Sequence, residues 1–256
     1  MPVVSVGLGF LIGLSLALLG GGGSILTVPV FVYVLGFGAK ESIAMSLAVV
    51  GVTSLVGAAG HWRLGHVRLR VALIFGVIAM LGTYIGTRLA TRLTGAEQLT
   101  IFAVAIVAAA GVMLSKRQTD AAHSRADGSS GPSTASAAFI AAQGLGVGML
   151  TGLVGIGGGF LIVPALVWGG LAMRQAIGTS LMAIAMNCAV GFYGYVGQVH
   201  IAWMPMVLLT AGTIPGIATG TYFIQFVPQH LLRPAFALFL VGLAAYMLYR
   251  TVPMVL

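Results

Sequence analysis

The chain has 256 residues, of which 59% are hydrophobic and only 6% are charged, and its formal net charge is +8. Soluble domains carry about 25% charged residues, so this composition excludes an ordinary water-soluble protein and indicates an integral membrane protein. The positive charge does not predict nucleic-acid binding, because the basic residues lie at the ends of apolar stretches, where they act as topology signals.

The apolar stretches lack the alternation of a β-barrel and therefore predict transmembrane helices, each of roughly 20 residues. Glycines interrupt the first stretch, leaving residues 3–19 before the cluster and 25–38 after it. Both pieces are shorter than the bilayer core, so they form either one broken, tilted helix or a re-entrant hairpin. Three uninterrupted spans follow, at about 42–61, 70–90 and 98–115.

A polar segment divides the chain into two membrane repeats, residues 1–115 and residues 137–256. This segment, residues 116–136, has the charged and Ser/Gly/Pro-rich composition of a flexible linker. The second repeat also begins with a glycine-broken stretch. Its uninterrupted spans are predicted at about 176–196, 203–226 and 233–250.

The two repeats share five motifs in the same order. Residues 20–29 match residues 155–164, and residues 43–47 match residues 177–181. Shorter matches relate residues 65–67, 82–87 and 102–114 to residues 197–199, 216–221 and 236–248. We therefore predict an all-α integral membrane protein of two homologous halves, each with a glycine-broken first segment and three transmembrane helices.

The basic residues favour the re-entrant alternative by one charge. If the first segments are hairpins, each half crosses the membrane three times, the second half is inverted, and eight Lys/Arg face the cytoplasm. If the first segments cross the membrane, the two halves are parallel and seven Lys/Arg face the cytoplasm. Positive-inside counting thus favours an inverted repeat. Both alternatives place the linker 116–136 in the cytoplasm.

The glycine clusters predict a binding site, since glycine costs about 1 kcal/mol relative to alanine inside a helix and four in a row mark a break. The helix after a break offers free N–H groups and the positive end of its dipole. Two breaks in corresponding positions indicate a transporter site near the midplane, although close helix crossing is another use of such glycines. The expected substrate-binding residues are Gly21, Gly22, Gly23, Ser24, Ser46, Gly157, Gly158, Gly159, Thr179, Ser180 and Asn187.

The hydroxyl and amide side chains in this set could bind an anion without a buried full charge, although Ser and Thr in membrane helices often bond their own backbone. Four residues near related span ends are candidates for gating or proton coupling, with interfacial anchoring the favoured alternative: His61, Arg63, Tyr193 and Tyr195. Small-xxx-small spacings predict close helix packing at Gly82/Gly86, Gly216/Gly220 and Gly144/Gly148/Gly152.

The sequence gives no indication of an enzyme. It has no paired embedded carboxylates, no HExxH pair and no nucleophile elbow, so we expect no catalytic residue, no metal and no cofactor. The absence of a nucleotide-binding motif also disfavours primary active transport by this chain alone.

The duplicated G-x-G-G-[GS]-x-[LI]-x-[VI]-P pattern, the A/G-x-S-L segment and the later G-x-x-x-G resemble the TauE/SafE family of membrane permeases, known as sulfite exporters. The resemblance covers nearly the whole chain outside the linker. It implies a secondary transporter that mostly exports sulfite, sulfonates or other organosulfur anions. It also implies a location in the bacterial inner membrane, in contact with membrane lipid. A homodimer is compatible with it, and a nucleic-acid partner is not.

The chain departs from the family in the loop after the second span. Family members often carry an acidic residue there, whereas this chain has Gly65-His66-Val67-Arg68 and Gly197-Gln198-Val199-His200. An anion channel and a carrier of small carboxylates remain the alternative functions.

Overall fold

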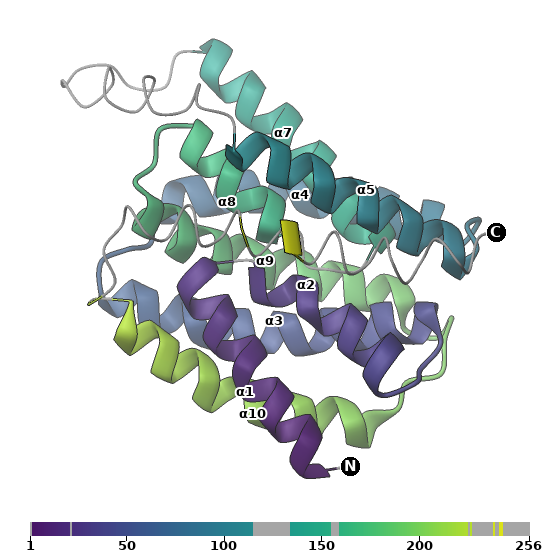
Figure 1. The fold of residues 1–256 in the computed structure, drawn as a ribbon. Helices are drawn as coiled ribbons and strands as arrows, with labels where there is room; N and C mark the ends of the chain where they lie inside the picture. The colour runs from purple at the N-terminus through teal and green to yellow at the C-terminus, as the bar shows by residue number, and fades with distance from the viewer. Residues whose placement is uncertain are drawn as a thin grey trace.

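The structure, a computed structural model, describes residues 2–20, 22–114, 134–154 and 159–224, with residues 226, 238, 241 and 242 beyond them. These residues form helices and connecting turns, with no strand among them (Figure 1). The first half contains α1 (Pro2–Leu19), α2 (Gly22–Pro29), the π-helical turn η1 (Val30–Val34), α3 (Ala39–Arg63), α4 (Leu69–Ala90) and α5 (Gly95–Leu114). The second half contains α7 (Thr134–Val154), α8 (Gly159–Trp168), α9 (Met173–Tyr195) and α10 (Trp203–Phe223).

Four helices in the described ranges, α3, α4, α9 and α10, are long and apolar enough to cross a membrane. Shorter apolar helices lie within α1, α2 with η1, α5 and α7. The prediction of a helical membrane protein is therefore confirmed. Most of the expected span at 233–250 and most of the expected linker lie outside the described residues.

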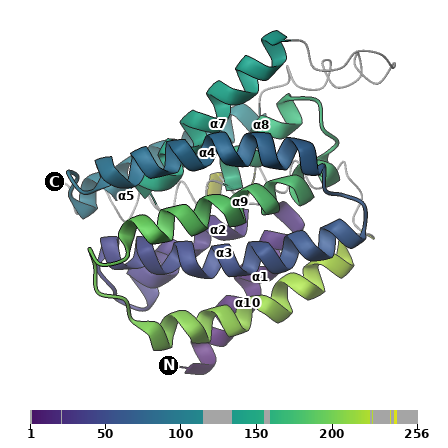
Figure 2. The same ribbon diagram turned by 180° about the vertical axis from the view of Figure 1, so that it is seen from behind.

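The four long helices lie side by side in the order α4, α9, α3, α10 (Figure 2). The central pair, α3 and α9, runs antiparallel, because Gly51 lies against Cys188 while Gly191 lies against Leu47. Farther along, Gly178 near the start of α9 packs on His61 near the end of α3. The two helices that correspond between the halves thus face each other along their length.

The first helix of each half packs on a helix of the other half. Gly13 of α1 lies against the Thr213 carbonyl of α10, and Gly148 of α7 lies against the Ala79 carbonyl of α4. A Cβ at either glycine would overlap the facing backbone. The Thr83 hydroxyl also donates a hydrogen bond of 3.1 Å to the Gly148 carbonyl across the second interface. Close packing at the small-xxx-small positions of α4, α7 and α10 is therefore confirmed, and Gly9 and Gly13 of α1 supply a further pair.

The glycine-broken first segment forms a helical hairpin. The chain leaves α1 at Gly20, whose φ of 70° is a left-handed conformation that suits glycine. α2 and η1 then run back, and Phe31 of η1 joins a buried cluster with Ile12 of α1 and Met206 of α10. The end of the returning arm therefore lies near the first half of α1.

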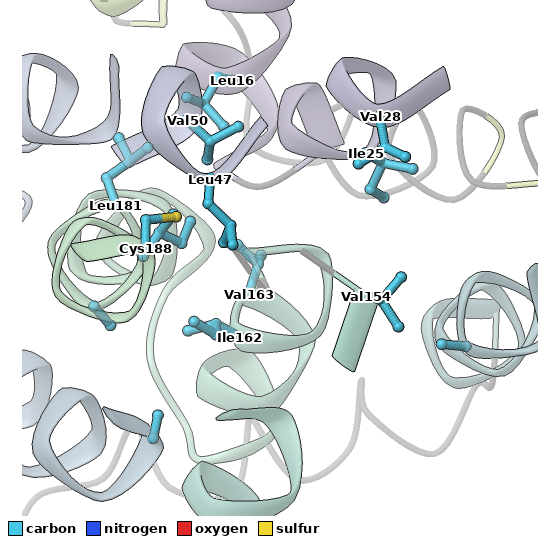
Figure 3. Close-up of a cluster of buried hydrophobic side chains, with 14 of the residues drawn as sticks. Leu16, Ile25, Val28, Leu47, Val50, Val154, Ile162, Val163, Leu181 and Cys188 are labelled. Atoms are coloured by element: carbon cyan, nitrogen blue, oxygen red, sulfur yellow. The ribbon is translucent and has the colours of Figure 1, made fainter. Parts of the chain in front are cut away.

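The centre of the molecule is filled by apolar side chains from both halves. Figure 3 shows Leu47 of α3 directed toward Val163 of α8, with Leu181 and Cys188 of α9 on one side. Leu47, Val163 and Leu181 are fully buried, as is Leu16 near the end of α1. The short helices α2 and α8 thus contribute fully buried side chains to this centre, among them Ile25, Val28 and Ile162.

Candidate functional site

The first helix break is narrower than the run of four glycines predicted. Gly22 and Gly23 are already helical in α2, and Gly20, with its positive φ, is the described residue at which the chain leaves α1. In the second half, Gly159 is the first residue of α8. Gly21, Gly157 and Gly158 lie outside the described residues, and their predicted role in binding stays a prediction.

Ser180 joins this break to the other half of the protein. Its hydroxyl lies 3.1 Å from the Gly20 carbonyl and 2.8 Å from the Ile177 carbonyl of its own helix. A hydroxyl has one proton to donate, and both neighbours are acceptors, so this proton is shared within the protein. The geometry makes Ser180 a residue that holds the break in place, with α9 packed closely enough that a Cβ on Gly20 would lie 2.9 Å from the Ile177 Cα.

The other predicted hydroxyl ligands are also buried and have structural bonds. Ser46 donates to the Ile43 carbonyl at 2.8 Å, which repeats the bond that Ser180 makes to its own helix. Thr179 accepts a 3.0 Å hydrogen bond from the backbone N–H of Arg68 and so ties the α3–α4 turn to α9. Ser24 is fully buried in the first turn of α2. Of these residues, Ser24 and Ser180 are at or beside the first break, and Thr179 points to the turn instead.

Asn187 differs from the hydroxyl residues because its polar atoms are unused. The side chain is fully buried, and neither its amide nitrogen nor its oxygen has a hydrogen-bond partner. Leaving an amide buried and unbonded costs about 1–3 kcal/mol in proteins, so such a group needs an explanation. At the related position of the other half, Thr53 bonds to Thr213 at 2.5 Å, so the defect belongs to one half only.

A second unbonded polar group lies nearby and was not predicted from the sequence. The Ser54 hydroxyl of α3 is fully buried without a partner. Asn187 is the neighbour of Cys188 along the chain, and Ser54 is one turn beyond Gly51, the residue that faces Cys188. Both polar groups therefore start within a turn of the contact between Gly51 of α3 and Cys188 of α9. A buried serine in an apolar helix gives no sequence signal, because many such hydroxyls bond their own backbone.

The four gating candidates fall into two different environments. Arg63 and Tyr193 are exposed, and the 78% exposed side chain of Tyr193 suits interfacial anchoring. His61 and Tyr195, at equivalent positions of the two halves, are buried. The Tyr195 hydroxyl donates to the Gly152 carbonyl at 3.0 Å and lies 3.3 Å from the amide nitrogen of Gln98. The His61 ring approaches the backbone of Ala17, but neither of its nitrogens reaches hydrogen-bond geometry.

His66 and Arg174 also lie at this end of α3, and neither is among the site residues predicted from the sequence. The rings of His61 and His66 lie 5.7 Å apart between centroids. Burial and the neighbouring guanidinium of Arg174 lower the pKa of His66 below its ordinary value of 6.5. Across the described residues, no group of three or more His, Cys, Asp or Glu side chains gathers that could hold a metal ion.

The sequence has known relatives along nearly its whole length. Residues 5–247 match the family described as sulfite exporter TauE/SafE. A probable membrane transporter protein of Xylella fastidiosa (strain Temecula1) is 32% identical over 97% of this chain and 95% of its own length. Another, YdhB of Bacillus subtilis, is 26% identical over 88% of this chain and 91% of its own. A Haemophilus influenzae relative, also named a probable membrane transporter, is 27% identical over 94% of this chain. No solved structure matches.

Proposed function

Because the chain belongs to the sulfite exporter TauE/SafE family and is a membrane transporter rather than an enzyme, we propose that it exports small organosulfur anions such as sulfite and sulfonates by secondary transport. The substrate-binding region is the buried part of α9 that extends from Ser180, where the hairpin of the first half meets α9, to Asn187. Small carboxylates would be weaker substrates of the same region.

The buried amide of Asn187 is the observation that carries this proposal. Its amide nitrogen can donate two hydrogen bonds, and sulfonate or sulfite oxygens are acceptors that need no opposing full charge at this point. Ser54 offers a further hydroxyl within about a turn of the same level. A substrate that bonds both groups relieves a cost that the empty protein carries, which favours binding in the interior over binding at the surface.

We further propose that the two halves form an inverted repeat with re-entrant hairpins. Equivalent helices that run antiparallel, as α3 and α9 do, are related by a two-fold axis perpendicular to their length. If both helices cross the membrane, that axis lies in the membrane plane and the second half is inverted. The return of η1 toward the first half of α1 supports a first segment that enters and leaves on one side.

The experiment is sulfite counterflow in proteoliposomes, with Asn187→Leu compared with Thr53→Val at the related position. Asn187→Leu replaces an unbonded buried amide by an apolar side chain of similar size, so we expect transport to fall about tenfold or more while the thermal midpoint holds or rises. Thr53→Val loses a hydrogen bond and should lower the midpoint with little effect on transport.

Full sulfite counterflow by Asn187→Leu would overturn the assignment of the site. Competition by acetate that equals competition by ethanesulfonate would overturn the preference for organosulfur anions. Counterflow requires a carrier that alternates between two sides, so a sulfite-dependent single-channel current without counterflow would replace the carrier by a channel.

A further inference from the structure

The turn after α3 brings two histidines together. Gly65 has a φ of 72°, its N–H bonds to the Trp62 carbonyl at 2.9 Å, and the His66 N–H bonds to the His61 carbonyl at 3.0 Å. This is the Schellman pattern of helix C-termini, which needs a left-handed residue, usually glycine, just past the cap. The pattern folds the chain back, so the ring of His66 lies against that of His61.

Three of the four ring nitrogens in this pair are buried without a hydrogen-bond partner in the protein. His61 is fully buried with both nitrogens unbonded, and Nδ1 of His66 is buried and unbonded as well. Arg174 is half-buried and close enough for its charge to act on His66. Of the acidic residues that the structure describes, Glu41 starts α3 and Glu97 starts α5, so neither lies at this end of α3.

The start of α9 adds to the positive character of this place. Ala172 provides no side-chain cap, and the first turn contains Arg174 but no acidic residue. A cation there opposes the positive end of the helix dipole and its free N–H groups, so the arrangement favours an anion that offsets both. The second turn of α9 holds Gly178, which packs on His61 and on the His66 carbonyl, next to Ile177 at the first glycine break.

We propose that His61, His66 and Arg174 form a second anion site, in which a small oxyanion accepts hydrogen bonds from the two imidazoles and the guanidinium. The site deepens the proposed function and rests on it. It would bind the transported anion between the first glycine break and the protein surface at the α3–α4 turn. Binding is accompanied by proton uptake at His66, since the anion favours its imidazolium form. Arg63 at the end of α3, Arg68 in the turn and Arg70 at the start of α4 are exposed around the same turn, and their charges draw anions to it.

The test is calorimetric titration of the purified full-length protein with ethanesulfonate, an anion whose own charge is constant between about pH 5 and 8. We expect wild-type protein to bind more tightly as the pH falls, and to take up protons on binding, as measured in buffers of different ionisation enthalpy. His66→Gln should abolish the pH dependence and weaken binding about tenfold. Arg174→Gln should weaken it by a similar factor, and Arg174→Lys should restore most of it.

The matched control is Lys40→Gln, because Lys40 is the residue related to Arg174 in the other half. It should leave affinity and proton uptake unchanged. Unchanged binding and proton uptake in both His66→Gln and Arg174→Gln would overturn the second site, while loss of binding in Asn187→Leu would still support the proposed function. No binding of ethanesulfonate or sulfite by the wild type would overturn both.

Discussion

The ends of α3 and α9 both lead into a glycine with positive φ, but they differ in turn geometry and in chemistry. Each helix ends before a glycine with positive φ, Gly65 at 72° and Gly197 at 84°. The last turn of α9 carries Tyr195, which bonds the end of α7 and contacts Gln98 of α5. The last turn of α3 carries His61, which meets the end of α1 without a bond.

This difference distinguishes a feature that packing explains from one that packing does not explain. In both halves the fold places a buried ring against the last turn of the first helix, α1 or α7, so packing alone accounts for the ring. It does not account for a histidine with two unbonded nitrogens, because a tyrosine at the related position is satisfied within the protein. In a duplicated fold, a polar defect present in one copy and absent from the other is therefore a better guide to function than a feature that both copies share.

The largest expected effect concerns a feature that the two halves share. In each half the first helix makes close glycine contacts with a helix of the other half, α1 with α10 and α7 with α4. Gly13→Ala and Gly148→Ala each place a Cβ against a facing carbonyl, of Thr213 and of Ala79. Overpacking of backbone on backbone should cost about 3 kcal/mol or more in each case, measured as loss of folded protein and of thermal midpoint in detergent.

Two glycines on the same helices serve as controls for that prediction. A Cβ on Gly7 of α1 or on Gly146 of α7 would meet nothing within 4 Å. Gly7→Ala and Gly146→Ala should therefore leave stability unchanged or raise it slightly through helix propensity. Equal effects in the close and open positions would contradict the interpretation of α1–α10 and α4–α7 as glycine-mediated contacts.

These interfaces also show which features of helix packing the sequence predicts and which it does not. The spacings at Gly82/Gly86 and Gly216/Gly220 predict that glycine faces meet another helix, and the structure confirms it. The identity of the partner could not be predicted, because α1 packs on α10 and α7 on α4, each across the boundary between the two halves. Local pattern fixes which face of a helix is small, whereas the partner depends on how the whole bundle closes.

The candidate site was predictable in part for the same reason. Residue type and position relative to the glycine clusters singled out Asn187 and Ser180, but not which of the two has a free donor. That depends on whether a carbonyl such as Gly20 lies opposite, and carbonyl positions come from tertiary packing. The pairing of His61 with His66 had a local sequence signal, the glycine between them at a helix C-terminus, but the pairing was not predicted from it.

The second prediction asks whether the two buried rings differ as described. Tyr195→Phe removes the hydroxyl that donates to the Gly152 carbonyl and should cost about 2 kcal/mol of stability. His61→Phe removes two unbonded nitrogens and should leave the thermal midpoint unchanged or raise it, while anion affinity falls. Equal losses of stability in both variants would mean that His61 is bonded as Tyr195 is.

The third prediction compares the two turns. Gly65→Ala and Gly197→Ala both place a Cβ in a left-handed conformation with open space around it, so each should cost about 1 kcal/mol. Only Gly65→Ala should also weaken ethanesulfonate binding, because the turn at Gly65 sets the position of His66. Equal binding by the two variants would show that the turn does not support an anion site.

The smallest expected effect is the pH dependence of stability without a bound anion. The pKa of His66 is lowered in the folded protein, first by burial and then by Arg174, from 6.5. The unfolded chain therefore binds more protons below about pH 6.5, and the contribution of His66 to stability, present above that pH, is lost as the pH falls. We expect the thermal midpoint of the anion-free protein to decline from about pH 7 toward pH 5, and His66→Gln to flatten the decline. Added ethanesulfonate should reverse it, because an anion that raises the pKa of His66 makes protonation favourable in the folded state. A decline that persists in His66→Gln would assign the titration to another group.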